Sequence, residues 1–221
     1  MKFDILTLFP EMFEAIKQSI IGRAIEKQLI QINLINIRDF SKDKHKKVDD
    51  TPYGGGAGMI MMPNVVYNAY SSIPNKENAK VIYLSPKGNV LNQKKVLELS
   101  KQEHLILLCG HYEGIDQRVI DEIVDEEISI GDYVLTGGEI PAMVLVDSVS
   151  RYIQGVLKQE STHEESFTNN LLEYPQYTRP EEFHKQKVPE VLLSGHHENI
   201  RKWREQQSLK ITKQKRPDLL K

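Results

Sequence analysis

The sequence predicts an α/β protein with a mostly parallel sheet and a small helical C-terminal domain. Three observations lead to this fold class. Short apolar runs alternate with amphipathic stretches, the runs are continuous enough for strands buried on both faces, and the last residues are basic and spaced like a helix. With 221 residues the chain can bury a sizeable core, which excludes general disorder.

Five apolar runs predict the strands of the sheet, and four amphipathic stretches predict helices between them. The strand segments are residues 2–8, 30–37, 80–85, 104–109 and 125–130. The helical segments are residues 10–19, 63–72, 91–100 and 115–124. Because strands and helices alternate, we expect βαβ units, whose ligands bind beyond the carboxyl ends of the strands.

A longer helix is predicted at residues 138–153, where apolar residues cover nearly the whole circumference. One side of this helix can face the sheet, and the other is either a subunit interface or also buried within the same subunit. Further along, Ser194 is predicted to cap a basic amphipathic helix. The expected domains are residues 1–157, a flexible polar linker at 158–170, and a helical domain at 171–221.

The charge of the chain is unevenly distributed. The net charge is −2, but residues 176–221 carry 11 Lys and Arg against 6 Asp and Glu, and a second basic run occupies residues 42–47. Each basic run is either a solvated surface or a set of phosphate contacts. The single cysteine excludes an internal disulfide, and no apolar run is long enough to span a membrane. The acidic start is unlike a signal peptide, so we expect a cytoplasmic protein.

Glycine gives the strongest local signal, since nine of the 13 glycines fall in residues 53–59 and 110–138. Glycine permits a positive φ and a close approach of backbone to a ligand. Neither window holds a Walker loop or a GxGxxG sequence, which argues against a nucleotide hydrolase or the usual dinucleotide site. Two glycine-rich loops of the second window follow the strands that end at Cys109 and Ile130. Together with the turn at residues 83–86, these two loops predict a pocket for a nucleotide-like ligand, although tight turns alone would explain any one loop.

Six motifs stand out along the chain: VDDTPYGGGAGM, YLSP, CGHYEGID, SIGDYVLTGGEIPAM, YPQYTRPEEF and VPEVLLSGHHENIRKWR. In this order and spacing, over nearly the whole chain, they resemble the bacterial tRNA (guanine-37-N1) methyltransferase family. The resemblance implies a SPOUT-like fold with a deep trefoil knot between about Val81 and Pro141. Knots are rare exceptions to the rules of chain connection, and no pattern in the residues predicts one.

The resemblance also implies that the knot binds S-adenosylmethionine as the methyl donor. The matching positions are Tyr83, Leu84, Ser85, Pro86, Gly110, Glu113, Ile130, Gly131, Asp132, Tyr133, Val134, Leu135, Gly137, Gly138 and Pro141. The cationic sulfonium favours a nearby acid, and Glu113 is the candidate; otherwise Glu113 is a surface residue that opens a helix at Gly114. A Mg²⁺ requirement is associated with the family, but no paired carboxylates identify a metal site, so no metal ligand is assigned.

Methylation at guanine N1 needs a base for the N1 proton and a group that stabilises negative charge at O6. By resemblance these catalytic positions are Glu165, in the linker, and Arg151, on the long helix. The family has aspartate where this chain has Glu165, so the site must accommodate one extra methylene group. The neighbouring Glu164 is the alternative candidate for the base. If Arg151 has no catalytic role, we expect its side chain to form an ion pair with Asp147, one helical turn earlier.

The expected partner is tRNA with guanosine at position 37, because a flipped anticodon-loop base exposes the edge that a duplex hides. Arg201, Lys202 and Arg204 are predicted phosphate contacts, and Asp50 resembles a residue that orients the target guanine. Trp203 is either a stacking platform or the core residue of the tail. The resemblance further implies a homodimer in which the partner's linker and tail complete the site; membrane and DNA partners are not expected.

Two other functions stay open. A relative that methylates a ribose 2′-hydroxyl needs no carboxylate base, so undiminished turnover of a Glu165→Gln enzyme favours it. A non-catalytic RNA-binding protein would bind the donor and transfer no methyl group to any tRNA.

Overall fold

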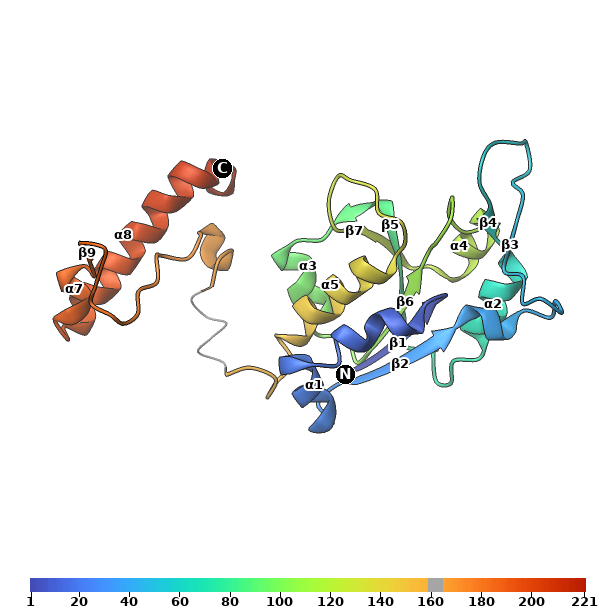
Figure 1. Cartoon of the computed structure of the whole chain (residues 1–221), viewed down its shortest axis with the longest axis horizontal. Helices are drawn as coiled ribbons and strands as arrows, with labels where there is room; N and C mark the ends of the chain where they lie inside the picture. The colour runs from blue at the N-terminus through green and yellow to red at the C-terminus, as the bar shows by residue number, and fades with distance from the viewer. Residues whose placement is uncertain (159–164) are drawn as a thin grey trace. The chain divides into compact units, whose positions relative to one another are not determined.

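The computed structural model describes residues 1–158 and 165–221, which form two compact units, residues 1–157 and 158–221 (Figure 1). The first unit holds the large sheet, and the second holds the basic helix. The competitor base Glu164 lies outside the described residues.

The first unit is built on a five-stranded sheet with the strand order β2-β1-β6-β5-β7. The strands are β1 (Lys2–Thr7), β2 (Gln31–Asn36), β5 (Lys80–Val90), β6 (His104–Cys109) and β7 (Glu126–Ser129). Each neighbouring pair in this sheet runs parallel. The prediction of an α/β protein with a mostly parallel sheet is confirmed.

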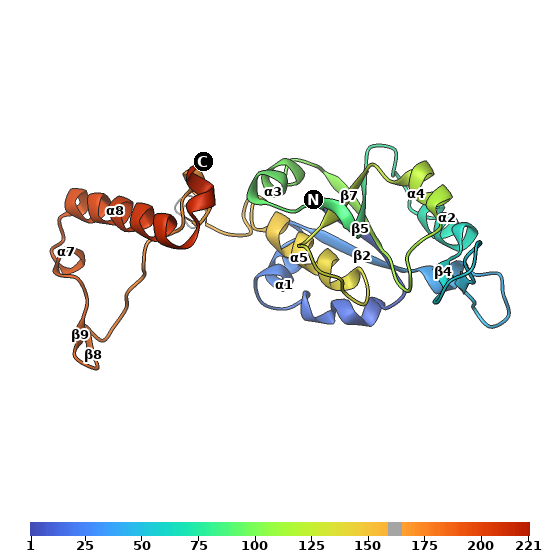
Figure 2. The same ribbon diagram turned by 90° about the horizontal axis from the view of Figure 1, so that it is seen from above.

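Helices cover both faces of the sheet (Figure 2). One face packs against the 3-10 helix η1 (Pro10–Ala15), α1 (Ser19–Glu26), α3 (Gln93–Leu99) and α5 (Glu139–Ser150). The other face packs against η2 (Ile37–Phe40), α2 (Pro63–Ser71) and α4 (Gln117–Ile123). Along β6, Leu105 and Leu107 enter the first core, and Ile106 and Leu108 enter the second. Burial on both faces explains why the strand sequences are continuously apolar.

Two elements of the first unit differ from the sequence prediction. The helix expected over 10–19 is a short 3-10 helix followed by α1, which begins at Ser19 with a positive φ of 57°. Strand β5 continues past residue 85 to Val90, where Asn89 and Val90 pair with Ile128 and Ser129 at the end of β7. Gly88 makes this approach possible, because a Cβ atom there would lie 2.3 Å from the backbone of Glu127.

The second unit contains one long helix and several short elements. They are η3 (Thr168–Asn170), β8 (Glu182–Phe183), β9 (Gln186–Lys187), α7 (Glu190–Leu193), α8 (His197–Lys215) and η4 (Pro217–Leu220). The prediction that Ser194 caps the basic helix is wrong, because its Oγ donates to the Val191 carbonyl at the end of α7. Gly195, with φ 70°, then separates α7 from α8.

A helix that crosses a membrane must be long and apolar. Within residues 1–158 and 165–221, none of the helices has the length and apolar content for it.

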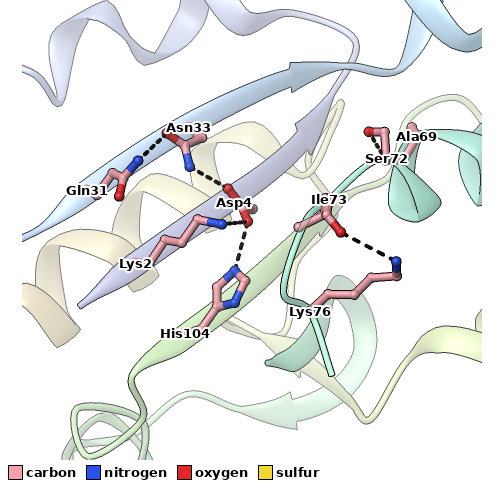
Figure 3. Close-up of polar contacts among 9 residues, drawn as sticks. All are labelled: Lys2, Asp4, Gln31, Asn33, Ala69, Ser72, Ile73, Lys76 and His104. Carbon is pink, nitrogen blue, oxygen red and sulfur yellow. Dashed lines mark hydrogen bonds and ion pairs between the residues drawn. The ribbon is translucent and has the colours of Figure 1, made fainter. Parts of the chain in front are cut away.

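A buried carboxylate joins three strands at their amino ends (Figure 3). Asp4 on β1 is only 2% exposed. Its Oδ2 accepts from the Lys2 ammonium at 2.7 Å and lies 2.8 Å from Nε2 of His104 on β6. Its Oδ1 accepts from the Asn33 amide on β2 at 2.7 Å. Because a buried charge is stable only when its partners are in place, Asp4 ties these strands together opposite the loops at their carboxyl ends.

Replacing Asp4 with alanine is expected to lower the free energy of unfolding by about 2–4 kcal/mol, because three polar groups lose a buried partner. Urea unfolding followed by circular dichroism measures this loss. Lys2→Ala is the matched control, since the Lys2 side chain is 25% exposed and its loss is expected to cost less than about 1 kcal/mol. Equal losses in the two variants would contradict the role assigned to Asp4.

Candidate functional site

A cavity of about 230 Å³ opens beyond the carboxyl ends of three neighbouring strands. Its walls come from residues 83–87 of β5 and from the loops that follow β6 and β7, at 110–115 and 129–138. The three segments that the sequence assigned to one pocket therefore meet. This is the edge at which parallel α/β sheets usually bind their ligands.

Most of the predicted donor-binding residues line this cavity. They are Tyr83, Leu84, Ser85, Pro86, Gly110, Glu113, Ile130, Gly131, Tyr133, Val134, Leu135, Gly137, Gly138 and Pro141. Asp132 belongs to the same loop but is not among the lining residues. The cavity also includes side chains that the sequence analysis did not single out: His111, Tyr112, Gln117, Ile120 and Glu127. No motif marks these residues as a group, and only the fold brings them to one place.

The loop after β7 returns to the end of β6 in direct backbone contact. The N–H of Gly138 donates to the carbonyl of Gly110 at 2.9 Å. A Cβ atom at Gly138 would lie 2.7 Å from the Cα of Cys109, so only glycine fits without a shift of backbone. The helix that follows is fixed by Glu139, whose buried Oε1 accepts from the Thr7 hydroxyl at 2.9 Å.

A glycine-rich loop at residues 51–59 lies against the same cavity wall. It is closed by a short antiparallel pair, β3 (Asp49–Asp50) and β4 (Ile60–Met61). The N–H of Glu113 donates to the Met59 carbonyl at 3.0 Å, and a Cβ atom at Gly58 would lie 2.4 Å from the Glu113 side chain. Glu113 is thus a wall residue of the cavity. It does not open a helix at Gly114, since Asp116 caps α4.

Tyr83 in the cavity wall and Cys109 in the core behind it are held in their neutral forms. Burial, helped by the nearby Glu127 carboxylate, raises the pKa of Tyr83 to about 12. Burial and the Glu139 carboxylate raise the pKa of the Cys109 thiol well above its usual value. A thiol that stays protonated is a poor nucleophile, so Cys109 is a core residue rather than a reactive group.

The proposed base, Glu165, lies in the second unit. It is half-buried and lines a groove of about 510 Å³ together with His197 and Arg204 of α8. The guanidinium of Arg204 stacks over the ring of Tyr174, at 4.7 Å from its centroid. The ring of Trp203 is half-buried, and its centroid lies 6.3 Å from the centroid of the Tyr177 ring.

The predicted phosphate contacts Arg201 and Lys202 are exposed and paired along α8. Arg201 contacts Glu205 at 2.7 Å, and Lys202 contacts Glu198 at 2.7 Å. Exposed pairs of this kind contribute little to stability, so these cations can exchange an intrahelical partner for a phosphate at low cost.

The remaining predicted site residues belong to the first unit. Arg151 is the half-buried C-terminal cap of α5, and its backbone N–H donates to the Asp147 carbonyl. Asp50 is exposed on β3 and contacts the Lys47 ammonium at 3.1 Å. The Thr51 N–H, followed by Lys47, lowers the pKa of Asp50, so this carboxylate is charged at neutral pH. Among the described residues, no three His, Cys, Asp or Glu side chains form a group that could hold a metal ion.

The whole chain, residues 1–221, matches the family described as tRNA (Guanine-1)-methyltransferase TrmD. The chain belongs to this family. It is 66% identical to the tRNA (guanine-N(1)-)-methyltransferase of Ruminiclostridium cellulolyticum, over 99% of this chain and 96% of the relative. Proteins with the same name from Clostridioides difficile and Caldanaerobacter subterraneus subsp. tengcongensis are 59% and 60% identical. Each alignment covers this whole chain, and 98% and 92% of the respective relatives.

The match to the TrmD family confirms the resemblance drawn from the six motifs. The motifs SIGDYVLTGGEIPAM and CGHYEGID supply the two loops that meet at Gly110 and Gly138. In this TrmD family protein, most residues of these two motifs therefore line the cavity.

Tyr83→Phe is expected to make folding less sensitive to alkaline pH. The folded-state pKa of Tyr83 is about 12, whereas an unfolded tyrosine titrates near about 10. The unfolded state therefore ionises first, and the contribution of Tyr83 to stability is complete below pH ~10 and lost as the pH rises toward 12. Urea unfolding between about pH 9 and 11.5 measures the slope. An equally steep slope in the variant would show that another group dominates.

Proposed function

We propose that this protein transfers a methyl group from S-adenosylmethionine to N1 of guanosine at position 37 of tRNA. The observation that carries the proposal is the cavity at the carboxyl ends of β5, β6 and β7. Its walls come largely from the motifs YLSP, CGHYEGID and SIGDYVLTGGEIPAM, in a chain that matches the family throughout. The names of the relatives specify guanine N1 in tRNA, and the motif resemblance supplies the donor and position 37. We place the reaction in the cytoplasm, where tRNA is used.

The lining residues suit an adenosine-containing donor. Leu84, Ile130 and Leu135 offer apolar walls for a purine, and the glycines leave backbone N–H and carbonyl groups within reach of its polar edge. Bound S-adenosylmethionine supplies the methyl group on a sulfonium and leaves as neutral S-adenosylhomocysteine. Glu113 lines the same cavity and places a negative charge where the cationic donor is favoured over the neutral product.

In this proposal Glu165 is the base that accepts the N1 proton, and Arg151 stabilises the developing negative charge. The N1–H bond of guanine breaks as the proton passes to the Glu165 carboxylate, and the electron pair left on N1 forms the bond to the methyl carbon. The Arg151 guanidinium stabilises the negative charge that develops at O6. The motif resemblance implies a homodimer whose partner completes the site, so we propose that the Glu165 carboxylate comes from the partner subunit.

The tRNA is proposed to bind through the basic second unit, residues 171–221. Arg201, Lys202 and Arg204 on α8 contact phosphates, and Asp50 orients the flipped guanine. Phosphate contacts release counterions, so tRNA affinity falls steeply with salt.

The strand-end loops between about Val81 and Pro141 are proposed to form the deep trefoil knot of a SPOUT-like domain, residues 1–157. Two observations support the knot. Strand β5 lies between β6 and β7 in the sheet, and the loop after β7 passes β5 to contact Gly110 at the end of β6. The 2.7 Å approach at Gly138 leaves no room for a side chain between the crossing segments. An experimental chain trace without a threaded crossing would contradict the knot.

A homodimer is proposed on the exposed side of α5. This apolar helix buries one side in the sheet core, while Ile140 and Val144 are 45% and 42% exposed. Met12 of η1 and Ile20 of α1 extend the exposed apolar surface beside it. Val144→Glu should therefore yield monomers in analytical ultracentrifugation, and an unchanged dimer would place the interface elsewhere.

Glu165→Ala is expected to lower the single-turnover methylation rate by about 10²- to 10⁴-fold, the range for loss of a positioned base. Donor affinity should stay unchanged. Purified tRNA and labelled donor give the rate, and mass spectrometry maps 1-methylguanosine at position 37. Glu165→Asp restores the family's carboxylate and is the matched control, with activity expected to remain. Donor binding without methylation of any tRNA by the unaltered protein would instead favour a non-catalytic RNA-binding protein.

A further inference from the structure

Tyr53 differs from the other exposed tyrosines, because its ring has no partner within the described residues. Its side chain is 99% exposed. The other exposed tyrosines each contact a second ring or donate to a backbone carbonyl, namely Tyr67, Tyr112, Tyr133 and Tyr177. In the part of the chain that the structure describes, Tyr53 makes no contact of either kind. Single exposed apolar residues are ordinary on protein surfaces, so the surroundings of this ring must decide its role.

A glycine turn holds Tyr53 out from the protein. The Gly55 N–H donates to the Pro52 carbonyl at 3.3 Å, and Gly54 has a φ of 87°, which glycine adopts without strain. Cβ atoms at Gly54, Gly55 and Gly56 would meet nothing within 4 Å, so the tip of the loop borders open space. Figure 1 shows the loop projecting from the ends of β3 and β4. The turn therefore presents the ring to a partner from outside the subunit.

The same loop keeps Tyr53 near the cavity. Gly58 lies against the side chain of Glu113 in the cavity wall. Gly58 follows Tyr53 by five positions, so the two Cα atoms are at most about 17 Å apart. Asp116 raises the pKa of Arg118 on α4, and the charge that the Tyr53 phenol can carry adds to this effect, so the phenol lies near α4. The exposed ring therefore belongs to the surroundings of the proposed active site.

Exposed cations precede this loop and favour a polyanionic partner. Residues 42–47 hold four lysines against one aspartate, and all six residues are exposed. The Asp43 carboxylate is turned to its own loop, where it accepts from the His45 N–H at 2.7 Å. Lys47 pairs with Asp50 at 3.1 Å, and the other three lysines have no carboxylate partner among the described residues. Positive charge close to an exposed ring suits a nucleic acid, with phosphates for the lysines and a base for the ring.

We propose that Tyr53 stacks on the tRNA base that adjoins the flipped guanosine, an inference that rests on the proposed function. When a nucleotide leaves a stack, the neighbouring base keeps one face uncovered. An aromatic ring covers that face, and every base offers such a face. Because the turn fixes the backbone of Tyr53 before RNA arrives, binding has to order little more than its side chain. The stack stabilises the RNA conformation in which the guanosine is turned out.

Equilibrium binding of the full-length protein to tRNA tests the proposal. Loss of one base–aromatic stack weakens RNA binding by about 5- to 150-fold, so Tyr53→Ala is expected to lose tRNA affinity by a factor in this range. Tyr53→Phe keeps the ring and should bind like the unaltered protein. Tyr53→Leu keeps apolar bulk without an aromatic face and should resemble Tyr53→Ala. Tyr67→Ala, at an exposed tyrosine of α2, is the matched control and should leave tRNA affinity unchanged.

Abasic tRNAs identify the stacked base. When the nucleotide on one side of the target guanosine is abasic, the unaltered protein should lose more affinity than Tyr53→Ala, because the variant has no stack to lose. The difference should match the loss that Tyr53→Ala causes on intact tRNA. An abasic nucleotide on the other side should weaken both proteins equally. Because the Tyr53 side chain is exposed, its variants should keep the urea midpoint of the unaltered protein.

Three results overturn the inference. Unchanged tRNA affinity of Tyr53→Ala, or equal losses by both proteins at both abasic positions, excludes a stacked neighbour. Weaker binding of S-adenosylhomocysteine to Tyr53→Ala, with tRNA affinity unchanged, makes the ring a cover of the cavity. Dissociation of a dimer by Tyr53→Ala in analytical ultracentrifugation makes it a contact with a second copy of the chain. If the unaltered protein neither binds tRNA nor methylates it, the proposed function itself fails, which is a distinct outcome.

Discussion

The close contact between Gly138 and the end of β6 is the constraint on which the cavity depends. At 2.7 Å from the Cα of Cys109, the missing side chain of Gly138 lets two backbone segments touch that are nearly thirty residues apart in sequence. The hydrogen bond from Gly138 to Gly110 then fixes the loop after β7 over the ends of β5 and β6. A cavity wall built from backbone in this way is rigid and offers both donors and acceptors, which suits a purine ligand.

The two ends of the parallel sheet have different roles. At the amino ends, Asp4 is surrounded by the partners that its charge requires, and it ties β1, β2 and β6 together. At the carboxyl ends, Oε2 of Glu127 accepts no hydrogen bond from the residues that the structure describes, and the glycine loops leave space instead of filling it. The first arrangement favours stability, and the second favours a ligand at some expense of stability.

The sequence predicts the sheet and the cavity loops because buried strands and glycine clusters are local signals. The five strand segments lie where β1, β2, β5, β6 and β7 form, and the motif residues line one cavity. Ser194 was misassigned because serine is also common at the end of a helix, where its hydroxyl bonds back to a carbonyl. Asp4 and Glu127 carry no local signal, since their environments depend on strands that are distant in sequence. The proposed knot, likewise, is implied by the resemblance alone, because the threading of a chain leaves no local signal in its residues.

The most direct test of the account is a crystal structure of the protein with S-adenosylhomocysteine bound. The account predicts that adenine lies between residues 130–135 and 83–85, with the sulfur directed toward the mouth of the cavity. Ligand found elsewhere on the protein, with the three loops closed on one another, would contradict it.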